Sequence, residues 1–571
     1  MIDSKDVLTR FLPQLEQSPR LHSGLTRFLA RLFHQDEIND FIQQNKHMSH
    51  VDFLETVNQR LGLSYTVSNS CLENVPVSGR VVIIANHPLG SLDGLALLEL
   101  IYSVRKDVKI VVNDMLWALS PLRPFFLPIN NLSQGKKPKA NLTSIQQALE
   151  DEAAVIFFPA GEVSRLTPKG VRDGRWRSGF LKMAKRTQSP ILPIHVGGQN
   201  SRFFYGLSLI AKPLSALFLV REMFKNVSLT VPIKIGKLIP FSSFSGMLTS
   251  SKESISRFKQ HVYGLKRERE ELFETERAIA HPENRKALID ELLNCQRLGE
   301  TSDGKSIYLL EDTRDSALLR EIGRLREIAF RTVGEGTGNR RDMDKYDYYY
   351  KHIFLWDHAD MELVGSYRIA DIHKLAPEQT LYSETLFSYE DSLRKKFPMA
   401  MELGRSFVQP KYWGKRSLDY LWFGIGAYLR QNPHIRYLFG AVSLSNDYPA
   451  FAKDMLAYYF SRYYGADFNL ARSFNPYRIK PVQKAKLEQL FYHLKKEDAF
   501  KVLKKELAKM GVSVPTLFKQ YSDLCEDGGV TFYDFGVDPD FGDCVDSVVW
   551  VDMLKLKEKK RKRYIEDLLA G

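Results

Sequence analysis

Short apolar runs alternate with helical stretches between residues 81 and 240. The runs include VVIIAN, VKIVVND, AAVIFFPAGE, PILPIHVGG and VPIKIGKLI, and the stretches between them include LDGLALLELI and NLTSIQQALED. Apolar strands separated by helices are typical of a sheet that is buried on both faces. The pattern therefore predicts an α/β fold for this part of the chain.

A second series of strands and helices begins beyond Gly304, with runs such as SIYLLED, MELVGSYRIA and RYLFGAVSLS. The chain has 571 residues, so two or more domains are expected. The charged stretch from Tyr263 to Lys286 is interpreted as their connection, or as a surface helix of either one. We predict an α/β chain with a helical segment at 1–74, an α/β domain at 75–262, a helical linker at 263–299 and a second α/β domain at 300–571.

The beginning of the chain has a helical pattern. In GLTRFLARLFHQ, which starts at Gly24, apolar residues recur at helical spacing while Arg27 and Arg31 point elsewhere. Such a helix suits a lipid interface, with its cations toward the headgroups, or a position packed on a core. We favour the packed position, because it is the commoner use of this pattern.

Net charge adds information that the hydrophobic pattern lacks. A charge of +13 indicates an anionic partner, which is nucleic acid, an anionic membrane surface or an acidic protein. The four cysteines form no CxxC pair, which argues against a disulfide framework and a zinc site. The N-terminus lacks a signal-peptide core, and Lys212-Pro213 interrupts the apolar run from Phe203 to Val220. We therefore expect a cytoplasmic protein.

Candidate chemistry lies at the end of the first apolar run, VVIIANHPLGSLDG, which places His87 just after a strand and Asp93 just after the next turn. These two residues suit general-base catalysis, in which His87 takes the proton of an acceptor hydroxyl and Asp93 orients the imidazole. The alternatives are a strand-capping histidine beside a helix-capping aspartate, and a metal site. No other His or Cys clusters with His87, and no G-x-S-x-G motif supplies a serine nucleophile, so we favour direct attack by the acceptor.

Two later stretches, FFPAGEVSR and PILPIHV, follow this motif in order. Together the three resemble the phosphate/glycerolipid acyltransferase family, typified by lysophosphatidate acyltransferases, over roughly residues 75 to 240. The resemblance implies that His87 and Asp93 form the catalytic dyad and that Asn86 of the Asn-His motif contributes to substrate binding. It also places Gly161 and Arg165 in the acceptor-binding loop.

This chain departs from the family pattern at two points. Five residues, PLGSL, separate His87 from Asp93 where the family has four, so we predict a bulged turn. The later loop reads Pro-Ala-Gly-Glu instead of Pro-Glu-Gly-Thr-Arg, which points away from a glycerol phosphate. We hypothesise that Glu162 pairs with an amine and Arg165 with a carboxylate of a zwitterionic head group.

The second half contains MELGRSFVQPKYWGKRSLDYLWFGIGAYL, which puts Glu402 and Arg405 at the end of a predicted strand. A turn with Gly414 and several cations follows, and the backbone amides at the start of the next helix suit the phosphate of a phosphopantetheine arm. The alternative is a plain strand-to-helix connection with a buried Glu402–Arg405 pair. Both interpretations stay open from these residues alone.

The sequence around this strand and turn resembles the lyso-ornithine-lipid N-acyltransferases over roughly residues 300 to 565. The stretches that carry the likeness include LREIAFRTVGEGTGNRRDMDKYD, VGSYRIA, ELGRS, GAVSLSNDYP and DFGVDPDFGDCVDSVVWVDM. These enzymes are GNAT-like and related to acyl-homoserine-lactone synthases, which implies that an amino-acid amine is acylated by a 3-hydroxyacyl group on acyl carrier protein. By this likeness Glu402 receives the amine's proton, and Arg405 positions the donor phosphate or the amino-acid carboxylate. Gly414 belongs to the phosphate loop, in which Arg416 replaces the second small residue of the usual pattern.

Two other motifs carry no ligand in our interpretation. The aspartates of DMDKYD do not have EF-hand spacing, and GEGTG lacks both the lysine of a P-loop and the dinucleotide pattern. We therefore expect no metal and no cofactor, with acyl-ACP as the co-substrate.

The two halves together resemble the bifunctional ornithine lipid synthases. The resemblance implies that the second domain N-acylates ornithine or another amino acid and that the first domain O-acylates the resulting 3-hydroxyl. Expected partners are acyl carrier protein and the inner face of the cytoplasmic membrane, where the protein is peripheral, and no nucleic acid. Basic clusters at Lys136, Lys137 and Lys139 and from Lys559 to Arg563 suit both acidic partners.

Two alternatives stand beside this hypothesis. One is a 1-acylglycerol-3-phosphate-type glycerolipid acyltransferase with a GNAT-like accessory domain. The other is a non-enzymatic protein that docks on membranes or nucleic acid and keeps two decayed acyltransferase folds. The intact His87 and Asp93 and the lack of a recognisable nucleic-acid module argue against the second.

Overall fold

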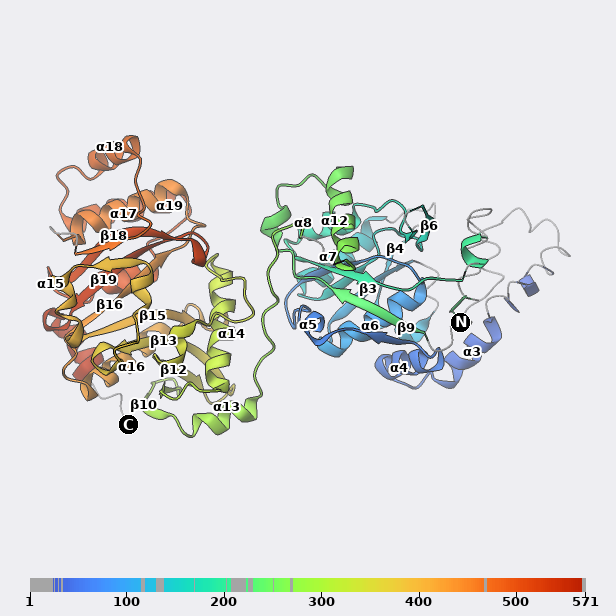
Figure 1. Ribbon diagram of the computed structural model, residues 1–571, viewed down its shortest axis with the longest axis horizontal. Helices are drawn as coiled ribbons and strands as arrows, with labels where there is room; N and C mark the ends of the chain where they lie inside the picture. The colour runs from blue at the N-terminus through green and yellow to red at the C-terminus, as the bar shows by residue number, and fades with distance from the viewer. Residues whose placement is uncertain are drawn as a thin grey trace. The chain divides into compact units, whose positions relative to one another are not determined.

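The computed structural model describes residues 24, 26–28, 30–31, 34–113, 119–129, 138–168, 170–201, 203–206, 222–223, 229–249, 251–267, 271–466 and 470–566. The chain divides into two compact units, Met1–Ala278 and Ile279–Gly571. Each unit has its own sheet (Figure 1). Each also has its own hydrophobic cores. The predicted linker at 263–299 spans the point of division.

The first unit is built on a sheet of seven strands in the order β1-β9-β8-β2-β5-β3-β4. All neighbouring strands are parallel except β8 and β9. In chain order the strands are β1 (Ser64–Thr66), β2 (Val81–Ala85), β3 (Val108–Asn113), β4 (Phe126–Ile129), β5 (Ala154–Phe157), β8 (Ile191–Val196) and β9 (Thr230–Ile235), with a separate hairpin of β6 (Arg165–Thr167) and β7 (Gly170–Arg172).

Helices cover both faces of this sheet. In β2, Val81, Ile83 and Ala85 pack into one core while Val82 and Ile84 pack into the other, so every residue of the strand is buried. The first core also receives α4 (His50–Arg60) and α6 (Ser91–Val104), and the second receives α7 (Pro138–Glu150), α8 (Gly179–Arg186) and α12 (Lys252–Leu265). Burial on both faces explains why the strands read as continuous apolar runs.

The second unit has a sheet of eight strands in the order β10-β11-β12-β13-β15-β16-β19-β18. Only β15 and β16 run parallel, and the other neighbours are antiparallel. The strands are β10 (Gln296–Glu300), β11 (Ser306–Leu310), β12 (Lys351–Asp357), β13 (Glu362–Asp371), β15 (Ala400–Val408), β16 (Tyr437–Leu444), β18 (Val530–Asp538) and β19 (Cys544–Asp552), with β14 (Phe387–Tyr389) and β17 (Ala471–Ser473) paired separately.

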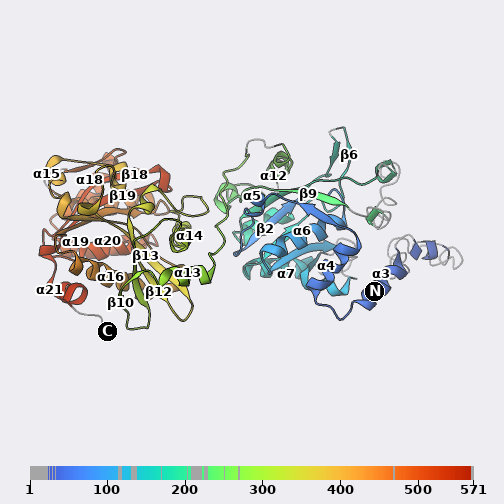
Figure 2. The ribbon, with the colours of Figure 1, turned by 60° about the horizontal axis from the view of Figure 1, so that its bottom comes forward.

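Helices cover both faces of the second sheet as well. One core contains α13 (Arg285–Leu292) and α14 (Ala317–Thr332), and the larger core contains α16 (Ser417–Gln431), α17 (Ala450–Tyr464), α19 (Lys496–Lys509) and α20 (Thr516–Ser522). The short α21 (Glu558–Arg561, Figure 2) is followed by a π-helical segment, Lys562–Glu566, which packs against α16. There Arg563 and Tyr564 bind Asp419, so the predicted basic cluster is partly used within the fold. The α/β class predicted for both halves is confirmed.

Several predictions fall partly outside the described residues. In the N-terminal pattern, residues 24, 26–28 and 30–31 are helical and the rest up to Phe33 are not described, so both interpretations of that helix stay open. Of the apolar run from Phe203 to Val220, only 203–206 are described. Lys136 and Lys137 and the side chain of Lys139 also lie outside the description. Within the described part of the chain, every helix is too short or too polar to cross a bilayer.

Candidate active sites

The central strand of the first sheet delivers the Asn-His motif to the sheet's carboxyl edge. Asn86 is 3% exposed, and its side-chain amide forms two hydrogen bonds with the backbone of Val196. Its Nδ2 donates to the Val196 carbonyl (2.7 Å), and the Val196 N–H donates to its Oδ1 (2.8 Å). These bonds extend the pairing of β2 with β8 and so fix the residue that follows, His87. A contact of Asn86 with substrate stays a prediction.

The structure brings His87 and Asp93 together. The Nδ1 of His87 lies 3.1 Å from Oδ2 of the fully buried Asp93, in the first turn of α6. The same Oδ2 accepts the backbone N–H groups of Leu89 (2.8 Å) and Gly90 (3.2 Å). Burial raises the pKa of Asp93, and the contact with His87 and the two N–H groups oppose that rise.

Gly90 explains how five intervening residues still close this pair. Its φ of +82° and ψ of −130° bend the turn back over the start of α6, and that region of backbone conformation is open almost only to glycine. The predicted bulge of the PLGSL turn is therefore located at this residue.

One face of the His87 ring is covered by an aromatic side chain, and the imidazole remains partly exposed to solvent. Its ring stacks on Phe158 with centroids 4.1 Å apart, and its side chain is 18% exposed. An imidazole that is fixed by a stacked ring and a carboxylate, yet open on one side, suits proton transfer with an incoming hydroxyl. The contact places the two side chains side by side, and their role as a catalytic dyad stays a prediction.

The later loop of the first unit is tied directly to the histidine. The backbone N–H of Ser164 donates to the His87 carbonyl (2.8 Å). Gly161 has φ +65°, Glu162 is exposed, and the half-buried Arg165 lies over the ring of Phe204, 5.4 Å from its centroid. The structure thus brings this loop to the dyad, while the head-group roles of Glu162 and Arg165 stay predictions.

Sequence reasoning missed Asp173, which joins these parts. Its Oδ1 accepts from the backbone N–H of His87 (3.1 Å) and from the Ser164 hydroxyl, and its Oδ2 accepts from Trp176 Nε1 (2.7 Å). Its own N–H donates to the Tyr263 hydroxyl (2.8 Å). The carboxylate therefore links the dyad loop to two other segments. The stretch VRDGRW contains no spacing that relates it to His87, 86 residues earlier.

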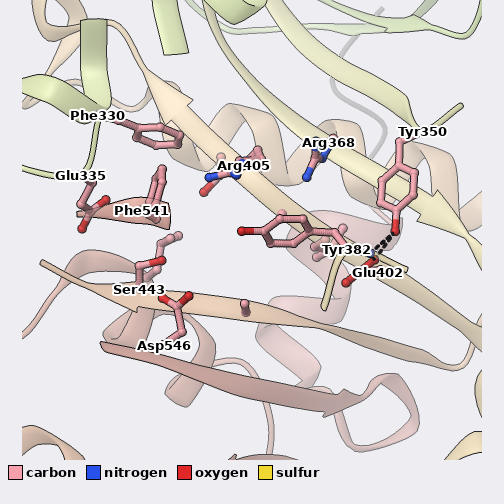
Figure 3. A pocket seen from close by; sticks show the side chains of 15 residues that line it. Phe330, Glu335, Tyr350, Arg368, Tyr382, Glu402, Arg405, Ser443, Phe541 and Asp546 are labelled. Atoms are coloured by element: carbon pink, nitrogen blue, oxygen red, sulfur yellow. Dashed lines mark hydrogen bonds between the residues drawn. The ribbon is translucent and has the colours of Figure 1, made fainter. Parts of the chain in front are cut away.

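The candidate site of the second unit lies where β15 and β16 stop pairing. Their parallel ladder covers only Ala400–Glu402 against Tyr437–Phe439. Beyond it lies a pocket with about 640 Å³ of empty space, which includes its solvent-open mouth. Figure 3 shows the side chains that line it, including Tyr350, Arg368, Tyr382, Glu402, Arg405, Ser443 and Asp546.

Arg405 enters this pocket from an irregular point of β15. The register of β13 with β15 shifts between Ser366 and Arg368, and Arg405 has φ +48°. Bulges of this kind re-aim a side chain next to a site. The guanidinium carbon lies 4.8 Å from the ring centroid of Tyr382 and 4.6 Å from that of Phe541.

The nearest acids hold Arg405 loosely. Asp342 and Asp344 approach it only at 3.8 Å, and its buried Nε has no hydrogen-bond partner among the described residues. Burial opposes the charged guanidinium, but Asp342, Tyr382 and Asp344 together outweigh it, so the pKa of Arg405 rises above its usual value. Arg405 is therefore a permanent cation with donor capacity left for an anionic group.

Glu402 shares the pocket with Arg405 but does not pair with it. Its Oε2 accepts from the Tyr350 hydroxyl and from the Tyr382 N–H (3.3 Å), and its Oε1 accepts from the Ser383 N–H (2.8 Å). Burial raises its pKa, against these hydrogen bonds. The buried ion pair weighed as an alternative is not formed. The role of Glu402 as proton acceptor stays a prediction.

The aspartates of DMDKYD are engaged with buried arginines. Arg326 contacts Asp342 and Asp347 at 2.8 Å each, and Arg368 contacts Asp344 at 2.6 Å and Asp347 at 3.1 Å. Burial alone raises the pKa of Asp347, but the two arginines hold it well below its usual range. This network fixes the wall of the pocket. Over the described residues, no group of three His, Cys, Asp or Glu side chains is arranged to hold a metal.

Two further acids of the pocket were missed. Glu335 follows α14 within GEGTG, and burial followed by repulsion from Asp546 raises its pKa to about 7. Asp546 lies in β19, and burial raises its pKa to about 6. A signal for Asp546 was present, since CVDSVVWVD places a carboxylate among apolar residues of one strand.

Gly414 occupies the turn before α16, with φ +74° and open space where a Cβ would stand. It is exposed and is not among the residues that line the pocket. Its predicted contact with a donor phosphate stays a prediction.

Comparison with known proteins matches both units. Residues 7–270 match the acyltransferase family, and residues 325–423 match the acetyltransferase (GNAT) domain. Lyso-glycine lipid O-acyltransferase of Bacteroides thetaiotaomicron is 34% identical over 260 residues, 44% of this chain and 93% of that protein. Glycine N(alpha)-acyltransferase of Phocaeicola vulgatus is 30% identical over 307 residues, 51% of this chain and 93% of that protein.

A third relative matches over a shorter stretch. L-ornithine N(alpha)-acyltransferase of Brucella abortus is 30% identical over 139 residues, 22% of this chain and 49% of that protein. The fold and its matches define an acyltransferase with a GNAT domain in its second half, as the sequence predicted. The chain belongs to the family of acyltransferases that includes the relatives from Bacteroides thetaiotaomicron and Phocaeicola vulgatus.

Proposed function

We propose that this chain is a bifunctional acyltransferase that makes a diacylated amino-acid lipid. The second unit joins a 3-hydroxyacyl group to the amine of an amino acid, and the first unit acylates the 3-hydroxyl of that product. One observation carries the proposal. Two relatives whose printed names describe consecutive steps, N-acylation of glycine and O-acylation of a lyso-glycine lipid, each match a different half of this chain along 93% of their own length.

Glycine is the amino acid that we propose. The relatives with glycine in their names are covered nearly in full, whereas the ornithine relative is covered over 49% of its length. We retain ornithine, the amino acid expected from the sequence, as the second candidate, because the pocket contains a second acid with a raised pKa, Glu335, besides Asp546. Two acids suit a substrate with two amines.

His87 acts on the hydroxyl in the first unit. As the acceptor's O–H approaches, His87 takes its proton, and the oxygen attacks the carbonyl carbon of an acyl thioester. Asp93 lies at Nδ1, so the proton is taken by Nε2, and the buried carboxylate stabilises the imidazolium that forms. The thiolate then leaves and is protonated by the imidazolium.

The donor for both steps is proposed to be an acyl thioester of acyl carrier protein. That carrier is strongly acidic, and the chain carries a net charge of +13, which favours its approach by long-range attraction. The same excess charge supports a peripheral position on an anionic membrane face, where the lipid product is delivered.

Mass spectrometry of lipids from a bacterium that lacks amino-acid lipids tests the function. Wild-type protein is expected to produce a diacylated glycine lipid. His87→Ala is expected to stop at the monoacylated amide, because it removes the base for the second step only. Glu402→Ala is expected to give little of either lipid, because the pocket for the first step loses its wall.

The matched control is His261→Ala, since His261 is a buried histidine of the same unit outside the site. It should leave the diacylated species in place. Diacylated lipid made by His87→Ala at the wild-type level would contradict the assignment of steps to units, and an ornithine lipid in place of the glycine lipid would select the second candidate.

A further inference from the structure

The second pocket contains charged groups that the roles above do not use. Asp546 is 3% exposed, and its buried Oδ1 has no hydrogen-bond partner among the described residues. The Ser443 side chain of β16 favours its ionised form, and Asp538 opposes it. Arg405 faces the same space with an unbonded Nε, and Glu335 lines the same end (Figure 3).

At this end of the pocket the guanidinium of Arg405 and the carboxyl groups of Asp546 and Glu335 carry opposite charges but form no ion pair. Over the described chain, no ion pair within 4 Å connects Arg405 with Asp546 or with Glu335, although each carboxylate feels the guanidinium electrostatically. A buried cation and a buried anion that face one cavity without touching leave room for a ligand that carries both charges.

Glu402 is poorly suited to be the proton acceptor beside these groups. Both of its oxygens already accept hydrogen bonds, from Tyr350, Tyr382 and Ser383. In Figure 3 it points toward Tyr350, and the ring of Tyr382 lies between it and Glu335 in that view. To accept another proton it would have to give up bonds that shape the pocket wall.

We propose that this end of the pocket binds the amino acid as a zwitterion, with Arg405 on its carboxylate and Asp546 on its ammonium group, and that Asp546 takes the amine's proton. Glu335 adds a second negative charge beside the ammonium. This assignment rests on the proposed function and goes beyond it, because it names the binding groups for the acceptor and replaces Glu402 as the base.

The proton and bond balance is complete within this assignment. The ammonium gives one proton to Asp546, and the neutral amine attacks the thioester carbonyl carbon. The C–N bond forms, the C–S bond breaks, and the departing thiolate takes the second proton from nitrogen. Asp546 then releases its proton to water. Its pKa of about 6 lets it be ionised before the step and protonated during it.

Steady-state kinetics of the full-length protein test the assignment, with glycine and a 3-hydroxyacyl thioester of acyl carrier protein as substrates. Asp546→Asn is expected to lower kcat/KM for glycine at pH 7 by about 100-fold or more. The deficit should shrink as the pH rises toward the pKa of the amine itself, where neutral amine is present without a base. Glu402→Gln should instead cause a loss that does not depend on pH.

A matched control separates this effect from loss of a buried acid. Asp454→Asn removes a carboxylate of α17 that accepts the Tyr477 hydroxyl (2.7 Å) outside the pocket, and it should keep wild-type kinetics. Glycinamide, which lacks the carboxylate, tests the other contact. Arg405→Gln should abolish the preference for glycine over glycinamide, and Arg405→Lys should retain part of it.

Each outcome decides between the assignment and the function on which it rests. A pH profile of Asp546→Asn that parallels the wild type, at full or reduced rate, overturns the role of Asp546 while N-acylation by the wild type stands. An unchanged glycine preference in folded Arg405→Gln overturns the role of Arg405. Wild-type protein that acylates no amino acid under these conditions removes the proposed function itself.

Discussion

Two buried aspartates show how their hydrogen bonds set the chemistry of each site. Asp93 and Asp546 are both buried and both have raised pKa values. Asp93 receives two backbone N–H groups and the contact of His87, which favour its ionised form. Oδ1 has no hydrogen-bond partner among the described residues in either aspartate, but Asp546 has the Ser443 side chain where Asp93 has two backbone N–H groups. Asp538 also repels its charge, so the ionised form of Asp546 is costly until a positively charged ligand arrives.

The cost of ionising Asp546 inside the folded protein predicts that the free energy of unfolding depends on pH. The pKa of Asp546 in the folded protein is about 6, above its ordinary value of 3.8. The folded state therefore binds the proton more tightly than the unfolded chain, and wild-type stability falls as the pH rises from about 4 to about 6. The asparagine of Asp546→Asn does not ionise, so the stability of this variant does not fall for this reason as the pH rises. We expect the variant to be more stable than the wild type by roughly 2–3 kcal/mol above pH 6 and equal to it below pH 4.

Chemical denaturation at a series of pH values measures this difference. Asp454→Asn serves as the comparison, since Tyr477 already bonds that carboxylate. Equal destabilisation by both variants at every pH would show that Asp546 carries no ionisation penalty.

At the scale of the element, one turn decides whether the first site exists. The PLGSL turn must fold back so that Asp93, at the start of α6, reaches the histidine at the end of β2. Gly90 makes this possible with φ +82°, and its N–H is one of the two that hold the carboxylate. A side chain at this position strains the backbone and moves the dyad apart.

We predict that Gly90→Ala abolishes O-acylation while the unit still folds. The substitution costs about 1–3 kcal/mol of backbone strain. Gly79→Ala is the matched control, because Gly79 has φ +84° just before β2 and the nearest atom to its Cβ would be 3.9 Å away. Both variants should lower the melting temperature, and only Gly90→Ala should accumulate the monoacylated amide. A fully active Gly90→Ala protein would show that the dyad tolerates another turn.

At the scale of the whole molecule, two self-contained units occur in one chain. Each has its own sheet and cores, and the relatives that match the halves do so along 93% of their own length. A unit that buries its own core is expected to fold by itself. The proposed intermediate therefore has to pass from one site to the other.

We predict that residues 1–278 and 279–571, expressed together as separate chains, still produce the diacylated lipid. Expression of 279–571 alone should give the monoacylated amide, and 1–278 alone should give neither. The lipid profile by mass spectrometry measures all three. Failure of the co-expressed pair, with both halves folded by circular dichroism, would mean that the covalent connection is needed for transfer.

Local patterns in the sequence determined much of this protein. Apolar runs predicted β2, β3, β5, β8 and β9 of the first sheet and β11, β13, β15 and β16 of the second, because buried strands require apolar side chains. His87, Asp93, Glu402 and Arg405 were singled out because each lies in a short motif. Such features depend on residues that are close in the chain. The resemblance of these motifs to known acyltransferases implied the acyltransferase class, which is confirmed.

Only the tertiary structure decided which distant residues complete each site. Asp173 accepts a hydrogen bond from His87, which lies 86 positions earlier in the chain. Glu335 and Asp546 line one pocket although they are far apart in the sequence. It also showed that Glu402 bonds to Tyr350 and Ser383 and forms no ion pair with Arg405. Periodicity and spacing do not encode strand order, whereas strand order and packing bring these charged side chains into one pocket.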